Sequence, residues 1–510
     1  MYLSSCNDTH GVIYYIDSGL GNDNHPGSSP EKAWASLQRL NQTEFQPGDK
    51  ILFRAGTEYF GQFKPGGFGS QEHPVMVDRY GEGDKPAIHG QGKYTSTLFL
   101  YNVEYWEINN LEITNKGENR EAGRRGVIIK AEDYGDCHHI HLKNLVIHDV
   151  NGSLIKSEGG GGAIFWKNGG DSIKTRFIDL LIEDCYMYRC ERNGINSRGY
   201  TSRDQWHPSL QVVIRNNLLE EIPGDGIVPI GCDGAMIEHN IMRNCPDILP
   251  HREAAAGIWP WSSDNTIIQY NEVSGHNAKW DGQGFDSDWN CQNTIIQYNY
   301  SHDNAGGFLL VCNNGNNIGT PRNVGTTGTI VRYNVSVNDG IRSYSTNRRG
   351  YFSPTMHISG PCYDTKIYNN VIFIPSKSKD EIDHTVIEMD NWGGPWPDTT
   401  LIVNNIFYSE DPLDFFWGES KNNTVTHNLF HGSFNNIPDE VRNIFKAPDW
   451  ADSGMIKPGL ESLEGFKLNP GSPCIKMGLK VAQGPVTDLF GNSLVESRSP
   501  SIGVHEFNDK

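Results

Sequence analysis

The sequence has little positive charge and no long hydrophobic run. Its 43 Lys and Arg residues are outnumbered by 62 Asp and Glu residues, which gives a formal net charge of −19. A chain this acidic repels phosphate backbones and anionic lipids, so nucleic acid and anionic membrane surfaces are disfavoured as partners. A membrane-spanning helix needs about 20 consecutive, mainly apolar residues. No such run occurs, so no membrane span is expected.

Cysteine motifs for metal binding and redox chemistry are also missing. The ten Cys residues form no CxxC pair and no spacing typical of a zinc site. A zinc ribbon and a thioredoxin-like motif are therefore not predicted, and no metal ligands are assigned. Isolated buried thiols are the favoured interpretation, with a few disulfides as the alternative.

Apolar residues make up only 36% of the chain, whereas Gly is abundant at 56 residues. This composition suits short strands joined by tight turns better than it suits large helices. The 12 Trp and 21 Tyr residues are plentiful, and their flat faces suit stacking against sugar rings.

From about residue 95 a pattern recurs: a β-branched run, an Asn or Asp, another short strand, a turn and often a Gly. "NTIIQYNEVSG" and "NTIIQYNYSHD" are two instances. Asn suits such corners because it tolerates left-handed backbone, and stacked Asn side chains can form a ladder. The recurring residues are Asn110, Asn144, Asp184, Asn217, Asn240, Asn271, Asn299, Asn334, Asn370, Asn405 and Asn428.

The repeat length selects the fold. Asn217 and Asn240 are 23 residues apart, whereas a β-propeller needs about 40–45 residues for each four-stranded blade. The sequence therefore predicts an all-β protein, a right-handed parallel β-helix with one coil per repeat. Residues 61–510 are interpreted as this β-helix, with loop insertions and a C-terminal closing coil.

Residues 1–60 are interpreted as a leader and cap. A β-solenoid exposes an open apolar end that needs cover. The segment "SPEKAWASLQRLN" predicts an amphipathic capping helix with Ser29 as N-cap and Pro30 in its first position.

A second strand in each coil usually opens at Gly, and an apolar residue follows. Because side chains alternate along a strand, that residue should face the core, and the second and fourth residues after Gly should face outward. The expected core column is Val127, Ala163, Ile195, Ile227, Ile258, Phe285 and Phe308. The expected outward pairs are Ile128/Lys130, Ile164/Trp166, Asn196/Arg198, Val228/Ile230, Trp259/Trp261, Asp286/Asp288 and Leu309/Val311.

Asp286 and Asp288, in "GFDSDW", are the predicted catalytic pair. Alternation places both carboxylates on the outer face, with Phe285 and Ser287 on the other face, and their Cα atoms roughly 6.6 Å apart. Paired acids are what glycoside hydrolysis requires. A solvated acidic strand and a Ca²⁺ site are the alternatives.

Coils stack ~4.8 Å apart, so Trp259 and Trp261 are expected one step from the acid pair, as a sugar platform. The later strands "PTMHIS" and "TVIEMDNW" place His357, Glu388 and Asp390 on the same face. Glu253 and Glu388 are reserve acids. Further expected substrate-binding residues are Trp166, Arg198, Asp225, Asp281, His302 and His357. The alternatives are a loop contact for the Trp pair, an ion pair for Arg198 and a turn role for His302.

Two long insertions, residues 313–325 and 341–353, are expected to form groove walls, from which Arg348 and Arg349 could reach substrate. At the start of the chain, Leu3-Ser4-Ser5-Cys6 matches a bacterial lipobox, although the charged and apolar regions of a signal peptide are missing. The match predicts export to the periplasm or cell surface with a lipid anchor at Cys6. A chance match is the alternative. A monomer is expected.

The chain resembles bacterial right-handed β-helix carbohydrate-active proteins. The resemblance rests on "YYIDSGLGNDNHPGSSPEKAWASL", on "GFDSD" followed by "NTIIQYNYSHDNAGGFLLV", and on "NPGSPCIKMG" followed by "SIGVHEF". The first and last segments are shared by hydrolases and lyases. The central segment is most similar to glycoside hydrolase family 141, which implies a fucosidase- or xylanase-type activity that uses carboxylates. The sequence pattern of polygalacturonases is not evident.

Three functions follow as hypotheses. The favoured one is a glycoside hydrolase that needs no cofactor and cleaves a plant or algal polysaccharide by paired-carboxylate acid/base catalysis. The second is a polysaccharide lyase, in which Asp286 and Asp288 hold Ca²⁺ against a uronate and Arg198 or Lys130 takes the proton. The third is a non-catalytic glycan-binding surface protein that uses the Trp face.

Overall fold

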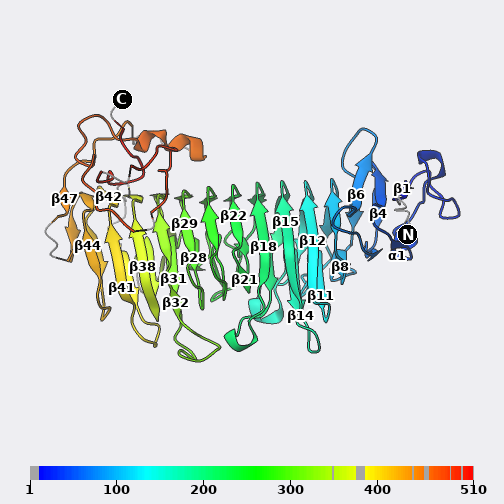
Figure 1. Ribbon diagram of the computed structural model, residues 1–510, viewed down its shortest axis with the longest axis horizontal. Coiled ribbons are helices and arrows are strands. Elements are labelled where there is room, and N and C mark those ends of the chain that lie inside the picture. Colours follow the sequence, from blue (N-terminus) through cyan, green and yellow to red (C-terminus); the bar gives the residue numbers. More distant parts are fainter. Residues whose placement is uncertain are drawn as a thin grey trace, which may run out of the picture. The chain divides into compact units, whose positions relative to one another are not determined.

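The computed structural model describes residues 11–346, 350–374, 385–438, 442–452, 459–482, 484–495 and 498–508. The chain forms two compact units. The first comprises Met1–Tyr200 with His207–Leu219, and the second comprises Thr201–Trp206 with Glu220–Lys510. Each unit consists mainly of short parallel strands that stack coil upon coil into three sheets (Figure 1). The predicted parallel coil architecture is confirmed.

The strands of the first unit follow one another around the coil, one strand per sheet. Its first sheet contains β1 (Ile13–Ile16), β3 (Lys50–Arg54), β6 (Val75–Tyr80), β9 (Trp106–Asn109), β12 (Asp136–Lys143), β15 (Arg176–Glu183) and β18 (Ser209–Arg215). Its second sheet contains β4 (Glu58–Phe60), β7 (Ala87–His89), β10 (Glu112–Asn115), β13 (Val146–Asn151), β16 (Tyr186–Glu191) and β19 (Leu218–Glu220). Its third sheet contains β8 (Ser96–Tyr101), β11 (Arg125–Glu132), β14 (Gly162–Gly169) and β17 (Asn193–Arg198), and β2 (Glu44–Phe45) pairs with β5 (Gly66–Gly67).

The second unit repeats this arrangement. Its first sheet contains β22 (Met236–Glu238), β25 (Ile267–Gln269), β29 (Ile295–Gln297), β33 (Ile330–Arg332), β38 (Cys362–Tyr368), β41 (Asp398–Val403) and β44 (Thr424–Thr426), with β32 (Thr326–Thr327) beside β38. Its second sheet contains β23 (Ile241–Arg243), β26 (Glu272–Ser274), β30 (Tyr300–His302), β34 (Val335–Val337), β39 (Val371–Ile374), β42 (Ile406–Ser409), β45 (Leu429–His431) and β47 (Ile444–Phe445). Its third sheet contains β28 (Gln283–Ser287), β31 (Gly307–Cys312), β37 (Met356–Ser359), β40 (Thr385–Asp390), β43 (Leu413–Phe416) and β46 (Phe434–Asn435). The remaining strands are β20 (Ile227–Val228), β21 (Cys232–Asp233), the pair β24 (Ala254–Ala255) and β27 (Trp280–Asp281), and the pair β35 (Ile341–Thr346) and β36 (Gly350–Phe352).

The predicted capping helix is only partly present. Pro30–Lys32 forms a 3₁₀ turn (η1), and the α-helix α1 covers only Leu37–Asn41. Between them the chain is extended, because Trp34 bridges to Ile16 of β1 and its amide donates to the Tyr15 carbonyl. This pairing interrupts the helix that the pattern predicts over the whole segment. The other helical turns are η2 (Lys156–Glu158), η3 (Arg203–Gln205) and η4 (Leu460–Phe466).

A ladder of buried Asn side chains runs through the second unit, as the repeat predicts. The Asn271 amide NH₂ donates to Asn299 Oδ1 at 3.0 Å, and Asn299 donates to Asn334 Oδ1 at the same distance. The series continues through Asn370, Asn405 and Asn428. The residue before each ladder Asn adopts the left-handed backbone conformation, for example Tyr298 with φ of 59°. In the second unit Asn therefore supplies the ladder and its neighbour supplies the turn, whereas in the first unit the predicted corner residues Asn110, Asn144 and Asp184 adopt left-handed backbone themselves, as expected.

The core columns confirm part of the predicted register. In the second unit, Ile227 bridges to Ile258 and Ile258 to Phe285, and all three are fully buried. The Gly before each is required because a Cβ on Gly257 would lie 2.3 Å from the Gly284 carbonyl oxygen of the next coil. In the first unit, Val127 and Ile195 are fully buried as expected.

Two coils depart from the predicted register by one residue. Gly162 pairs with Arg125, and Gly307 pairs with Gln283, so each Gly lies one position earlier than expected. A one-residue slip turns every side chain of a strand to the opposite face. Ile164, Trp166, Leu309 and Val311 therefore face the core and are fully buried, and the prediction that they face outward is wrong.

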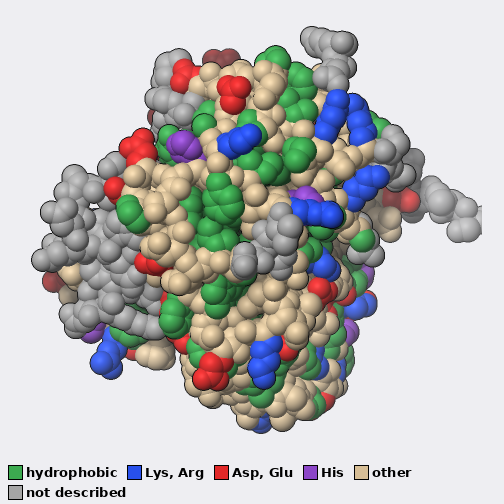
Figure 2. Space-filling model, turned by 90° about the vertical axis from the view of Figure 1, so that its left-hand side faces the viewer, with side chains coloured by type: hydrophobic (Ala, Val, Ile, Leu, Met, Phe, Trp, Pro, Cys, Tyr) green, Lys and Arg blue, Asp and Glu red, His purple; other side chains and the backbone are tan. Residues whose placement is uncertain are grey.

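The C-terminal segment closes against the second sheet of the second unit. Leu463, Phe466, Ile502 and Val504 are buried in one cluster with Val371 and other residues of this sheet. Figure 2 shows the surface at the left-hand side of Figure 1. On this surface, hydrophobic side chains lie in separate clusters among uncharged polar side chains and backbone, with charged side chains of both signs between them. All nine Cys residues in the described ranges are free and buried, as expected. Among the described residues, no helix has the length and apolar character needed to cross a membrane.

Candidate active site

Asp286 and Asp288 project from the outer face of the third sheet in the second unit. Between them, Ser287 is fully buried, and its Oγ lies 2.9 Å from Thr329 Oγ1 inside the coil. Phe285 is also fully buried. Because side chains alternate along a strand, the two Asp side chains must point away from the core. This orientation agrees with the prediction.

Asp288 has a polar neighbour that the sequence did not reveal. The Cys312 thiol, from the next coil, donates a hydrogen bond to Asp288 Oδ1 at 2.9 Å, and the Trp289 backbone amide donates to the same oxygen at 2.5 Å. Burial raises the pKa of the Cys312 thiol well above its usual range, and the charges of Asp288 and Asp286 raise it further. The thiol is therefore a neutral donor, which lies close enough to both carboxylates to sense their charge.

Aromatic side chains lie beside the acid pair. The bridge between Ile258 and Phe285 sets Trp259 level with Asp286, and the Asp288 amide donates to the Pro260 carbonyl. Trp261 packs edge to face against Trp289, with 5.9 Å between ring centroids. Trp259 and Trp261 are half-buried and thus reachable from solvent. Trp259 and Trp261 thus lie beside the acids, as the register predicts, and Trp289 packs against Trp261.

The column that contains Asp286 continues along the sheet. Its successive members are Leu310, His357, Glu388 and Phe416. His357, Glu388 and Asp390 form a cluster whose donor atoms lie within 4.8 Å of one another. Trp392 packs edge to face on His357 at 5.5 Å and is 42% exposed. The predicted outward position of His357 and Glu388 is therefore correct, and Trp392 is an aromatic neighbour that the sequence analysis missed.

One wall of the outer face is built by two loops that contact each other. The Arg203 guanidinium forms a bidentate ion pair with Asp264 and stacks on Trp206. The Arg203 backbone amide donates a hydrogen bond to the Pro321 carbonyl at 2.6 Å. Within the 313–325 insertion, Asn313 and Asn323 exchange side-chain hydrogen bonds of 3.0 and 2.8 Å. These contacts hold the two loops together beside the strand ends that carry the acids, and their expected role as a groove wall stays a prediction.

The hairpin β35–β36 forms a second wall at the opposite ends of these strands. Arg342 is 5% exposed and donates to the carbonyls of Ala278 and Asp281 at 3.0 and 2.9 Å. Asp281 pairs with Ala255, two residues after Glu253. Glu253 and Asp281 are half-buried. Arg348 and Arg349 lie outside the described residues.

Two other predicted site residues are almost fully buried. His302 is on the second sheet, is 6% exposed, and its ring nitrogens contact Glu272 and Asp303 at 3.0 and 2.8 Å. This placement on a different sheet removes it from the acid face. Asp225 is 2% exposed and accepts a hydrogen bond from the Ala256 amide.

Two expected binding residues belong to the first unit. Trp166 faces the core and is fully buried, so it cannot contact substrate there. Arg198 is exposed at the end of β17 and stands level with Lys167 in the neighbouring coil. Lys130 and Lys167 both form ion pairs with Glu132.

Comparisons with known proteins agree with this architecture. A family profile described as a right handed beta helix region matches residues 162–348. The chain is 25% identical to a protein named lacto-N-biosidase from Bifidobacterium longum subsp. longum, over 97% of this chain and 36% of that protein. It therefore spans little more than a third of that relative's length. The fold is a right-handed parallel β-helix.

Solved structures show the same fold. A glycoside hydrolase family 136 lacto-N-biosidase from Eubacterium ramulus superposes with a TM-score of 0.60 at 24% identity, over 82% of this chain and 68% of that one. A structure described as the complex of XylC with xylose superposes with a TM-score of 0.53 at 13% identity, over 98% and 99% of the two chains. The expected similarity to family 141 is not supported, because none of the three proteins above is described as a member of that family.

Proposed function

We propose that this protein is a glycoside hydrolase that releases a lacto-N-biose unit from a glycan. The observation that carries the proposal is the Asp286/Asp288 pair, which faces outward beside Trp259, Trp261 and Trp289. The 25% identity to a lacto-N-biosidase across almost the whole chain supports the reaction class. This name favours a lacto-N-biose glycan over the plant or algal polysaccharide that the sequence alone suggested.

The two acids would divide the work of hydrolysis. Asp288 accepts hydrogen bonds from the Cys312 thiol and the Trp289 amide, and such donors stabilise a carboxylate. We assign it the ionised role, activation of water or attack on the anomeric carbon. Asp286, which is 3% exposed, would give its proton to the departing glycosidic oxygen. Neither role requires a cofactor.

Sugar binding would use the aromatic side chains. Trp259, Trp261 and Trp289 lie next to the acids, and Trp392 lies further along the same face. Flat aromatic faces bury the apolar faces of sugar rings while the hydroxyl groups stay solvated. Export of the protein, a lipid anchor at Cys6 and a monomeric state are further proposals, and Cys6 lies outside the described residues.

The direct test is digestion of a tetrasaccharide with lacto-N-biose at its non-reducing end, in water enriched in ¹⁸O. Hydrolysis predicts release of the disaccharide by mass spectrometry, with one ¹⁸O atom in the products. A uronate polymer, tested in parallel, should yield no unsaturated product that absorbs in the ultraviolet. Cleavage of that polymer instead of the tetrasaccharide would support the lyase alternative, and cleavage of neither would favour a glycan-binding protein.

A further inference from the structure

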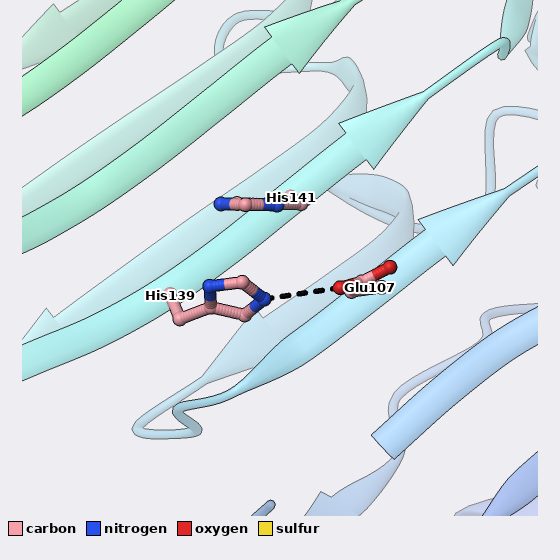
Figure 3. Close-up of side chains that lie close together, drawn as sticks. All are labelled: Glu107, His139 and His141. Atoms are coloured by element: carbon pink, nitrogen blue, oxygen red, sulfur yellow. Dashed lines mark hydrogen bonds and ion pairs between the residues drawn. The ribbon is translucent and has the colours of Figure 1, made fainter. Parts of the chain in front are cut away.

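A second cluster of chemically active side chains lies in the first unit, on the outer face of its first sheet. β12 contributes His139 and His141, β9 contributes Glu107, and β15 contributes Asp179. Figure 3 shows both imidazole rings beside the Glu107 carboxylate. One donor atom from each of Glu107, His139 and His141 lies within 4.8 Å of the others.

The backbone brings the two rings together. His141 is the direct partner of Glu107 on the neighbouring strand. His139 and Asp179 both adopt left-handed backbone, with φ of 52° and 62°. They face each other at the one position between β12 and β15 where the regular pairing is interrupted. The centroids of the His139 and His141 rings are 3.8 Å apart.

Asp179 determines which nitrogen of each ring is available. Its two oxygens contact His139 Nδ1 at 2.7 Å and His141 Nε2 at 2.9 Å. When Asp179 accepts a hydrogen bond from each ring, His139 Nε2 and His141 Nδ1 are left with lone pairs. His139 Nε2 lies 3.1 Å from Glu107 Oε1. His141 Nδ1 is buried and has no hydrogen-bond partner in the described part of the chain, and His141 is only 9% exposed.

We propose that Glu107, His139 and His141 bind a divalent transition-metal ion such as Zn²⁺, with Asp179 as the outer carboxylate that orients both rings. Imidazole nitrogen and carboxylate oxygen are ligands that Zn²⁺ prefers, at about 2.0–2.2 Å. A ligating His commonly donates its other ring N–H to a carboxylate, which is the role of Asp179 here. Three protein ligands leave a position for water.

Lys143 is the one opposing charge that contacts these ligands among the described residues. Its Nζ lies 3.6 Å from Glu107 Oε2, and its side chain is 32% exposed. Because the Lys143 side chain is flexible and reaches solvent, it can turn away when the carboxylate takes up a cation. The three ligand atoms, which lie within 4.8 Å of one another, would then close around the ion.

The alternative is a purely structural set of hydrogen bonds between coils. His148, on β13, provides the matched comparison in the same unit. Its two ring nitrogens contact Glu112 at 3.1 Å and Asp149 at 2.7 Å, as in His139, but no second imidazole lies beside it in the described ranges to complete a ligand set. Replacement of His148 therefore removes similar contacts without removing a metal ligand.

The test is Zn²⁺ binding to the untagged full-length chain by isothermal titration calorimetry, with Co²⁺ absorption as a second readout. Wild type and His148→Gln should bind Zn²⁺ with equal stoichiometry and affinity. His141→Gln should bind at least tenfold more weakly and lose the visible Co²⁺ bands. Glu107→Gln, which keeps both rings, should do the same if His141→Gln does not fold. Asp179→Asn should weaken binding about 10–100-fold.

Circular dichroism would establish that each variant is folded. Failure of the wild type to bind Zn²⁺ would overturn the proposal, as would unchanged Zn²⁺ affinity in folded His141→Gln or Glu107→Gln. Either result would leave the cluster with a structural role only. The proposal does not depend on the glycosidase proposal, because its readouts are binding and spectroscopy.

Discussion

Ser287 Oγ lies 2.9 Å from Thr329 Oγ1 in the interior of the second unit. This contact fixes the direction of one side chain on β28 and therefore of its neighbours. Asp286 and Asp288 must point away from the core because Ser287 faces it. The proposed catalytic roles of both acids depend on that alternation.

The role of Asp286 as proton donor predicts a dependence on the leaving group. The 4-nitrophenolate ion leaves a 4-nitrophenyl glycoside without being protonated. A sugar leaving group must be protonated by an acid as it leaves. Asp286→Asn should lower kcat by about 10²-fold or more on the natural glycan and much less on the nitrophenyl glycoside. An equal fall in kcat on both substrates would show that Asp286 is not the proton donor. Glu253 and Glu388 would then be tested in that role.

Trp261 is expected to bind substrate without taking part in bond cleavage. Trp261→Ala should raise KM by roughly tenfold, which corresponds to about 1.4 kcal/mol of lost stacking. The value of kcat should change little. Phe445→Ala, which removes an aromatic ring that is 64% exposed on the second sheet, is the matched control and should change neither constant. A fall in kcat alone for Trp261→Ala would contradict a binding role.

His302 should make the stability of the second unit depend on pH. Burial opposes its protonation, but hydrogen bonds with Asp303 and Glu272 raise the pKa of His302 to about 9. Since the unfolded value is about 6.5, this contribution is complete below pH ~6.5 and is lost as pH rises through 9. The free energy of unfolding should fall by about 3 kcal/mol at most. Burial raises the pKa of the nearby Asp339 only to about 6, so this carboxyl titrates below that window.

Urea denaturation between pH 6 and 9.5 would measure this effect. His302→Gln should be less stable than wild type at pH 6 and should lose most of the decline toward pH 9. A wild-type curve that stays flat across this range would show that the ion pairs of His302 add nothing to stability.

Chelation should leave activity intact. Paired-carboxylate hydrolysis moves protons between side chains, water and sugar and has no step that requires a metal ion. Dialysis against EDTA, followed by assay on the tetrasaccharide, should preserve turnover. Loss of turnover that Ca²⁺ restores would support the lyase alternative, in which the acids hold the ion.

The sequence predicted the coils, much of the core column and the outward acid pair, because each depends on a short-range repeat. The residues wrongly predicted to face outward were misplaced because the lateral register of two strands was misjudged. Gly162 and Gly307 looked equivalent to Gly284 but lie one position earlier, which placed Trp166 on the wrong face. The same slip concealed the contact between Cys312 and Asp288.

His302 illustrates a different limit of sequence reasoning. Its partner Glu272 is 30 residues away and becomes a neighbour only when two coils stack. A motif such as "YSHDN" gives no sign of this ion pair. The cluster of Glu107, His139 and His141 was missed for the same reason, since it combines residues from different coils.

The proposed glycosidase mechanism requires Asp288 to act as a catalytic carboxylate. The most direct test is the kcat of Asp288→Asn on the lacto-N-biose tetrasaccharide, beside Asp364→Asn as an exposed control on the first sheet. We predict that Asp288→Asn lowers kcat by about 10²-fold or more with unchanged folding, and that the control retains wild-type kcat. Near-normal kcat in folded Asp288→Asn would rule out a catalytic role for Asp288.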